Sequence, residues 1–537
     1  MLKNFVLAAS LIALPASLIG CATPDGGDDD TCADGRCDDV PDSEVPPSPC
    51  DGIMVDDSGR GNKKVAGRLN DPVAKLVFRA GDNCPTSFQD VMAKLRETDK
   101  EGCPNESDGI QTRVVSETAQ ASGTPTSYRA VVTRTCGGRA TDGIIFSLFG
   151  LRAGQTTLPA SVEIMGFDDT AGVFNYYETD GQGKVHFFGS SKDMLDGPGQ
   201  AGVRRCAVCH TGGGLVMKEL DTPWLHWEGH ENTAGAAELV TANKDLGRKN
   251  TGAEFEGVVK QGNTKWNKAR LDFVKSGPKA VENLLKPLFC SVEFNLDNGA
   301  DFASPVAGGP GGSQISGLPF DSLLDPNLKG FGSLPITFAD YDAQIKANGQ
   351  NVEGVTGAID TIFDYVYLER SHADTNFVQQ LKTAGIIDDD LMKDVLMVDF
   401  TRPVFSSDRC SLLSFVPDLA GADLTAGKIR DGLIANLEAE GPAEGSAGAV
   451  LLANLKATGD DAAHTAKVDT FTNACKALGS KPLVENALKI TSLNRQTARS
   501  MQVFEFAATM PSDDLSVDAA SRLDPKTCQI TNRFVAP

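Results

Sequence analysis

Two cysteines and a histidine near the middle of the chain carry its clearest chemical signal. Cys206, Cys209 and His210 form the pattern C-x-x-C-H within the segment RRCAVCHTGGGL. Thiols at this spacing can add to the two vinyl groups on one edge of a porphyrin, and the imidazole of the next residue then reaches the iron from the proximal side. The pattern therefore predicts one covalently attached haem c, with His210 as the proximal ligand of the haem iron.

The residues that flank the motif are candidates for the remaining haem environment. Met217, His226 and His230 could each supply the distal iron ligand, or no residue of this chain does so and each is a packed residue beside the haem. Trp224 would cover a face or an edge of the haem, with a role as an ordinary core aromatic as the alternative. Arg205 would pair with a haem propionate, because a guanidinium matches a carboxylate, or it would be an exposed surface arginine.

Other chemistries that use the same residue types are less well matched. A thioredoxin-like dithiol needs its C-x-x-C at a helix start within a βαβ unit, and no βαβ pattern surrounds this one. A zinc site needs further ligands; His226 and His230 are near in sequence, but no second C-x-x-C occurs. No H-E-x-x-H or G-x-S-x-G motif occurs either. Electron transfer through the predicted haem is favoured over catalysis.

The N-terminal segment predicts secretion and lipid anchoring. Lys3 is followed by the apolar run FVLAASLIALPASLIG, so residues 1–20 read as a signal peptide. The sequence LIGC that ends at Cys21 resembles the bacterial lipobox, whose cysteine is acylated; an ordinary signal peptide with a nearby cysteine is the alternative. Residues 21–61 are rich in Asp, Pro and Gly and predict an extended tether. We therefore expect a lipid anchor on Cys21 that holds the protein to the bacterial cell envelope, on its periplasmic or cell-surface side, with the outer membrane favoured.

The elements that must position the motif fall into two regions of different periodicity. Residues 62–240 read as a β-rich domain that contains one helix, around SFQDVMAKLRET, and then leads into the motif. The last two expected strands flank a glycine-containing hairpin loop at Asp180–Gly183. The expected strands are runs of β-branched and aromatic residues bounded by turn formers: SYRAVVTRTC, GIIFSLFGL, SVEIMGF, GVFNYYET and KVHFFGS.

Residues 241–537 read as mostly helical, with a glycine-rich linker near 298–318. Four segments support this prediction: two with apolar residues at i, i+3, i+4 and i+7, beginning at Val281 and at Ile429, and the segments IDTIFDYVYLERS and DDDLMKDVLMVDF. The other histidines and the methionines of these regions are expected to be structural: His186 in a strand, His372 and His464 on helix surfaces, and Met392, Met397, Met501 and Met510 in helix cores. The predicted fold class is α+β.

Composition and cysteine usage agree with an envelope protein. A net charge of -22 argues against nucleic-acid binding, which needs a basic surface. Besides the cysteines assigned to lipid and haem, ten remain, and oxidising compartments favour their pairing in up to five disulfides. Cys32 with Cys37 could close a small loop in the tether; the others are Cys50, Cys84, Cys103, Cys136, Cys290, Cys410, Cys475 and Cys528.

Through Cys206, Cys209 and His210 the chain resembles the single-haem c-type cytochromes of bacterial envelopes. Strands that end in a hairpin and lead into C-x-x-C-H also look like the β-sheet cytochromes, namely cytochrome c′-beta and the lysine-crosslinked hydroxylamine-oxidising cytochromes. The resemblance implies one-electron transfer with a redox partner protein. The alternatives are a haem enzyme or gas-binding haem protein with an open distal site, and an anchored structural or interaction lipoprotein. No lysine stands out as a haem crosslink, so hydroxylamine oxidation is not implied.

Overall fold

The structure is a computed structural model that describes part of the chain. The signal peptide and the tether expected for residues 1–61 lie outside it. The described residues are 69–78, 85, 87–102, 110–116, 128–134, 144–159, 161–179, 181, 185–195, 210, 212–215, 234–246, 252–290, 294–297, 314–315, 336–337, 367–370, 372–402, 406–479, 481–483, 485–486 and 522–537.

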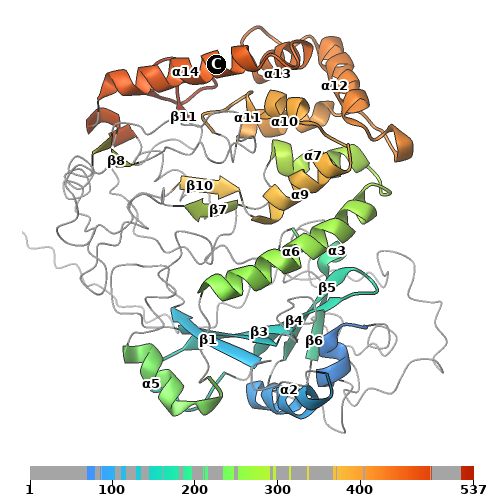
Figure 1. Cartoon of the computed structure of the whole chain (residues 1–537), viewed down its shortest axis with the longest axis vertical. Helices are drawn as coiled ribbons and strands as arrows, with labels where there is room; N and C mark the ends of the chain where they lie inside the picture. Colours follow the sequence, from blue (N-terminus) through green and yellow to red (C-terminus); the bar gives the residue numbers. More distant parts are fainter. Residues whose placement is uncertain are drawn as a thin grey trace, which may run out of the picture.

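A six-stranded antiparallel sheet forms the N-terminal half of the described structure (Figure 1). Its strands pair in chain order, and the five strands expected from the sequence are all present. The hairpin expected between the last two is confirmed by their antiparallel pairing and by Gly181, whose φ is +69°. The strands are β1 (Ile110–Ser116), β2 (Tyr128–Arg134), β3 (Ile144–Leu151), β4 (Val162–Asp168), β5 (Val173–Thr179) and β6 (Val185–Ser190).

Both faces of this sheet are buried, because its strands alternate between two hydrophobic cores. On β2, Ala130 and Val132 enter one core and Val131 enters the other. On β5, Tyr177 belongs to the first core and Tyr176 to the second. The side chains of these two adjacent tyrosines therefore pack on opposite faces of the sheet.

Short helices cover the first face of the sheet (Figure 1). They are η2 (Val73–Phe78), α2 (Phe88–Gly102), α5 (Ala234–Ala242) and η7 (Lys244–Leu246). The α2 helix confirms the one expected around SFQDVMAKLRET, and Ser87 Oγ accepts a hydrogen bond from Asp90 N at its start, 3.2 Å away. The α5 helix spans the boundary expected at residue 240 and still packs on the sheet.

A buried carboxyl group joins η2 to the sheet on this face. Asp71 is fully buried and accepts hydrogen bonds from the backbone N–H groups of Val73 and Ala74, at 2.8 and 3.1 Å. It also accepts from Asn175 Nδ2, at 2.8 Å, and from the Tyr177 hydroxyl. Burial raises the pKa of Asp71 above its usual value of 3.8, although these hydrogen bonds act in the opposite direction.

The second face of the sheet is covered by a long helix, α6 (Gly252–Val274), together with the short α3 (Ser191–Met194). The opposite side of α6 packs on α9 (His372–Thr383), where Asn267 Nδ2 donates to Ala373 O at 2.7 Å and Arg270 lies 4.2 Å above the Phe377 ring. Figure 1 shows α6 between the sheet and the remaining helices. One helix therefore contacts both halves of the molecule.

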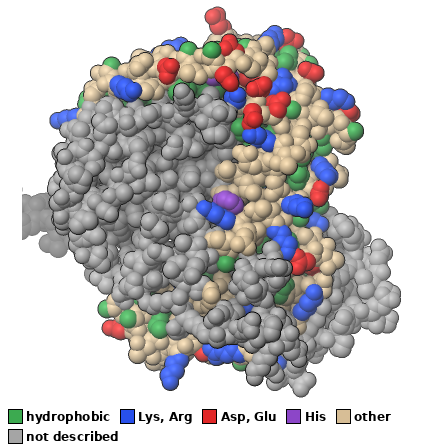
Figure 2. Space-filling view, in the orientation of Figure 1, with side chains coloured by type: hydrophobic (Ala, Val, Ile, Leu, Met, Phe, Trp, Pro, Cys, Tyr) green, Lys and Arg blue, Asp and Glu red, His purple; other side chains and the backbone are tan. Residues whose placement is uncertain are grey.

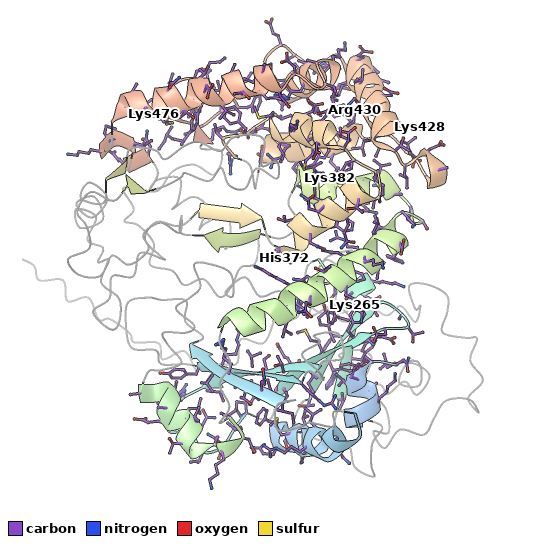
Figure 3. All side chains as sticks on the ribbon, viewed as in Figure 1. Lys265, His372, Lys382, Lys428, Arg430 and Lys476 are labelled. Carbon is purple, nitrogen blue, oxygen red and sulfur yellow. A yellow bond between two sulfur atoms is a disulfide. The ribbon has the colours of Figure 1, made fainter. Side chains whose placement is uncertain are left out.

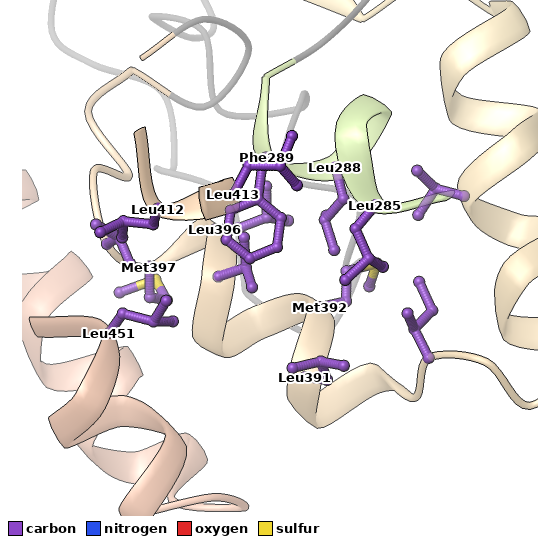
Figure 4. Close-up of a cluster of buried hydrophobic side chains, with 14 of the residues drawn as sticks. Leu285, Leu288, Phe289, Leu391, Met392, Leu396, Met397, Leu412, Leu413 and Leu451 are labelled. Carbon is purple, nitrogen blue, oxygen red and sulfur yellow. The ribbon is translucent and has the colours of Figure 1, made fainter. Parts of the chain in front are cut away.

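The C-terminal half of the described structure is a set of helices around one core (Figure 4). The apolar residues expected on two helix faces are all in or against this core: Val281, Leu284, Leu285 and Leu288 on one, and Ile429, Leu433, Ile434 and Leu437 on the other. Met392 and Met397 are fully buried in it, as expected. The helices are α7 (Ala280–Phe289), α9, α10 (Asp389–Leu396), α11 (Ser407–Ser411), α12 (Ala426–Glu440), α13 (Ala447–Lys456) and α14 (Asp461–Leu478), with η8 (Leu412–Phe415) and η9 (Gly421–Asp423).

Side-chain caps explain where several of these helices begin. Asp388, Thr425, Ser446 and Asp460 each accept a hydrogen bond from the backbone N–H three residues later. Such caps satisfy a backbone donor that has no partner within the helix, which favours initiation at that residue. The surface of this region carries interspersed acidic and basic side chains (Figure 2).

Two expectations for this half were wrong. Tyr367–Arg370 was expected to be helical, but it forms strand β10 and pairs with β7 (Phe294–Asp297), because a long-range partner strand outweighed local helical periodicity. His464 was expected on a helix surface, but it is buried, with its Nε2 3.3 Å from Asp394 Oδ1. Within the expected linker, Gln314–Ile315 pairs as β8 with β9 (Ile336–Thr337).

Two disulfides join distant parts of the helical region. Cys290 bonds to Cys410 across 120 residues, and Cys475 bonds to Cys528 across 53. The second bond holds the C-terminal pair of strands, β11 (Arg522–Leu523) and β12 (Ile530–Thr531), against α14. The prediction of disulfides is thus confirmed for these four cysteines, and the other six of the expected set lie outside the described residues. No helix in the described ranges is both long and apolar enough to cross a membrane.

Candidate functional site

The residues that follow the C-x-x-C-H motif form a tight turn against the second face of the sheet. Of the motif itself, the structure describes His210, and of the residues after it, 212–215. The backbone N–H of Gly213 donates to His210 O at 2.8 Å. The ring atom Nδ1 of His210 lies 2.9 Å from Gly214 O. The histidine is therefore tied to its own turn by its backbone and by its side chain.

The hydrogen bond to Gly214 O determines which ring nitrogen of His210 carries the proton. A carbonyl oxygen can only accept, so Nδ1 donates to it. In the neutral imidazole the lone pair is then on Nε2, the nitrogen through which a haem-bound histidine coordinates iron. Histidines that ligate metals almost always donate their other N–H to a carbonyl or carboxylate in this way. The described geometry thus fits a proximal haem ligand.

Tyr176 on β5 holds the turn from the side of the sheet. Its hydroxyl donates to Gly213 O at 2.9 Å and to Gly214 O at 3.2 Å. Its ring lies beside the His210 ring, with the two centroids 5.0 Å apart. Because Tyr176 is 2% exposed and belongs to a paired strand, the turn has a rigid support on this side.

Two side chains of α6 hold the turn from the opposite side. Asn263 accepts a hydrogen bond from Leu215 N at 2.7 Å and donates one to Leu215 O at 3.1 Å. Its side-chain amide therefore provides a hydrogen-bond partner for both the backbone N–H and the backbone carbonyl of Leu215. One helical turn further on, Trp266 Nε1 donates to Gly212 O at 2.8 Å. Leu215 itself is buried in the core between sheet and helix. The backbone oxygens of four successive residues, Gly212 to Leu215, are therefore all satisfied by side chains.

The glycine run explains how the turn approaches its neighbours so closely. Gly213 has φ +72°, a conformation that L-residues rarely adopt, and a Cβ there would lie 2.3 Å from the backbone oxygen of Ser191. A Cβ on Gly214 would lie 2.6 Å from Asn263 Oδ1. The sequence TGGGL directly after the motif was thus a signal for this turn. Tyr176, Asn263 and Trp266 are far away in the sequence and carried no local signal of their own.

The remaining residues expected at this site fall outside the described part of the chain. The structure therefore places His210 but does not test the thiols, the distal-ligand candidates or the propionate and haem-face partners: Cys206, Cys209, Met217, His226, His230, Arg205 and Trp224. Cys21, the expected lipid-bearing cysteine, is outside it as well. Among the residues that are described, no three or more His, Cys, Asp and Glu side chains gather as a metal-binding group.

The other described histidines lie in different surroundings. His186 is in β6, as expected, and pairs across the strands with Glu178 of β5. His372 begins α9; Figure 3 labels it and Lys265 of α6. His464 lies within the helical core beside Asp394. His210, by contrast, has its ring Nδ1 hydrogen-bonded to a backbone carbonyl of its own turn.

Comparison of the chain with models of protein families, with curated proteins and with solved structures gives no match.

Proposed function

We propose that the protein is a monohaem c-type cytochrome that transfers single electrons, with haem attached through Cys206 and Cys209 and His210 as the proximal ligand. The observation that carries this proposal is the hydrogen bond between His210 Nδ1 and Gly214 O. It orients the imidazole and selects the tautomer that a haem iron requires. When bound, the haem would supply the one-electron chemistry.

The chain's own residues contribute orientation and burial. The His210 ring is held between its own turn and the Tyr176 ring, and the turn is held by Asn263 and Trp266. A histidine held in this way would lose little conformational freedom on binding iron, and the same contacts would hold it in either oxidation state. Low reorganisation of this kind suits electron transfer.

Covalent attachment can be tested by producing the protein with the haem-maturation machinery and staining a denaturing gel for haem. We expect haem to migrate with the wild-type chain. The Cys206→Ser and Cys209→Ser variants should each lose one thioether bond, and the double variant should lose covalent haem altogether. A matched control is the double variant Cys290→Ser and Cys410→Ser, which removes a disulfide in the helical half and should retain covalent haem. Absence of covalent haem from the wild-type protein would refute the proposal.

A second candidate function is a gas-binding haem protein or haem enzyme with an open distal position. It is favoured by the setting of His210, whose ring packs on Tyr176 of an antiparallel sheet, as the resemblance to the β-sheet cytochromes implies. Spectra of the reduced protein with and without carbon monoxide separate the two candidates. A six-coordinate low-spin spectrum that carbon monoxide leaves unchanged supports electron transfer, and rapid formation of a carbon monoxide complex supports the open distal site.

We further propose that Cys21 carries the lipid that anchors the protein to the bacterial envelope. The support is the apolar N-terminal run that ends in LIGC, followed by an acidic segment of tether composition. Detergent-phase partitioning of the protein, with Cys21→Ala as the variant, tests the assignment. Wild-type protein in the detergent phase and the variant in the aqueous phase is the expected result. Equal partitioning of the two would contradict it.

A further inference from the structure

One carbonyl oxygen at the candidate site accepts from two side chains. Gly214 O is 2.9 Å from His210 Nδ1 and 3.2 Å from the Tyr176 hydroxyl oxygen. The same hydroxyl also donates to Gly213 O at 2.9 Å, so its proton is shared between two neighbouring carbonyls. We propose that Tyr176 is a positioning residue that sets the strength of the His210 Nδ1–H hydrogen bond and thereby raises the reduction potential of the haem. This inference rests on the function proposed above.

The effect follows from how a carbonyl shares its electron density. A carbonyl oxygen offers two lone pairs and can accept from two donors. Each donor draws on the electron density of the same oxygen, so two donors on one carbonyl oxygen compete with each other. The hydroxyl of Tyr176 therefore weakens the bond that Gly214 O forms with His210. A weaker bond leaves the imidazole with less anionic character.

The character of the imidazole in turn affects the two oxidation states of the iron unequally. A proximal histidine that donates strongly to a carbonyl becomes a more basic ligand. A more basic ligand favours the ferric state, so it lowers the reduction potential. Because Tyr176 weakens that hydrogen bond, its hydroxyl should favour the ferrous state.

The geometry separates this tuning from general support of the turn. Asn263 and Trp266 bond to Leu215 and Gly212, so the turn keeps three hydrogen bonds to α6 when the Tyr176 hydroxyl is removed. Tyr176 is nearly fully buried, so removal of the hydroxyl keeps the ring in its place.

The neighbouring tyrosine provides a matched control. Tyr177 is equally buried on the same strand, but its hydroxyl donates to Asp71 on the other face of the sheet. Tyr177→Phe therefore removes a buried hydroxyl at the adjacent position without touching Gly214 O. It should cost stability and leave the reduction potential unchanged.

The test compares the midpoint potentials of wild type, Tyr176→Phe and Tyr177→Phe by spectroelectrochemical titration of the purified haem-loaded proteins. We expect Tyr176→Phe to have a lower potential than wild type, so that its ferrous-to-ferric ratio at a fixed potential falls severalfold, and Tyr177→Phe to match wild type. A potential that is unchanged or higher in Tyr176→Phe would overturn the inference. An equal fall in both variants would also overturn it, because the effect would then not depend on the shared carbonyl.

A second variant decides the matter if Tyr176→Phe fails to accumulate with haem. A tyrosine that carries one ring fluorine beside the hydroxyl, incorporated at position 176, keeps the fold and makes the hydroxyl a stronger donor. We expect this protein to have a higher potential than wild type, and an unchanged or lower potential would overturn the inference. Wild-type protein without covalent haem would refute the proposed function itself. Haem-loaded protein with no shift in any variant would refute only the role of Tyr176.

Discussion

Substitution of Asn263 by alanine tests whether α6 holds the turn after the motif. The Asn263 side chain is 3% exposed and forms hydrogen bonds of 2.7 and 3.1 Å to the two backbone groups of Leu215. In Asn263→Ala both groups would be left buried without these partners. A buried polar group left without a partner costs about 1–3 kcal/mol, so we expect a total loss of about 2–4 kcal/mol, with water entry offsetting part of it.

A matched control lies one helical turn away on the same helix. Asn267 is also fully buried, but it donates to Ala373 O at 2.7 Å and to Asn376 Oδ1 at 3.1 Å, on the side of α9. Asn267→Ala should lower the free energy of unfolding by a similar amount. It should leave the turn at residues 210–215 intact.

The assay is amide hydrogen exchange of the intact protein, read by mass spectrometry on peptides that cover residues 210–215. A local loss of 2 kcal/mol corresponds to roughly 30-fold faster exchange, since each 1.4 kcal/mol is a factor of ten. We expect this acceleration in Asn263→Ala and not in Asn267→Ala. Unchanged exchange of these peptides in Asn263→Ala, or equal acceleration in both variants, would refute the anchoring of the turn by α6.

Three further predictions concern the turn, the sheet and the helical half. In urea titrations, Gly213→Ala should lower the free energy of unfolding by about 2–4 kcal/mol, because a Cβ would lie 2.3 Å from a backbone oxygen of α3. The control is Gly441→Ala, at a position with a similar positive φ but open space around it, which should cost only about 1 kcal/mol. Burial raises the pKa of Asp71, so the free energy of unfolding of wild type should fall relative to that of Asp71→Asn as the pH rises from the usual pKa of 3.8 through the raised pKa. Urea titrations at several pH values measure this difference, and a difference that is independent of pH would contradict the prediction. Replacement of both Cys475 and Cys528 by serine opens a loop of 53 residues, which should lower the free energy of unfolding by about 4 kcal/mol if the disulfide acts by restricting the unfolded chain. Thermal unfolding measures the change. A loss below about 1 kcal/mol would show that the C-terminal strands are held without the disulfide.

The sheet could be predicted from the sequence wherever its strands are rich in apolar and β-branched residues. The strand β1, with the sequence IQTRVVS, was missed because Gln111, Thr112 and Arg113 interrupt the apolar alternation that identifies a strand. Both Thr112 and Arg113 are nevertheless buried. Pairing with β2 and cover from α5 stabilise a strand that local pattern alone does not indicate.

In the helical half, the core faces of two helices were predicted correctly, but one strand was predicted as a helix. Periodicity predicted the core residues of α7 and α12, because a helix that buries one face must repeat apolar residues on it. The same reasoning was wrong for Tyr367–Arg370, since whether that segment pairs with β7, some 70 residues earlier, depends on tertiary contacts. His464 was predicted to lie on the surface of its helix. It is buried because Asp394 of another helix supplies a polar partner there.

The candidate site could be predicted only in part, for a comparable reason. His210 was predicted from a five-residue motif whose spacing is set by the chemistry of haem attachment. Its supports, Tyr176 and Asn263, are 34 residues before it and 53 residues after it, so only the folded chain brings them together. The glycines at 212–214 are typical of a close backbone approach, but they do not indicate which side chains are approached.

The measurement that tests the central claim most directly is the mass of the intact, denatured protein after production with haem-maturation machinery, followed by identification of the modified peptide. We predict that the chain mass is increased by that of one haem and that the haem is carried by a peptide containing Cys206 and Cys209. A chain of unmodified mass at these cysteines, from cells that load other c-type cytochromes in the same culture, would contradict the assignment.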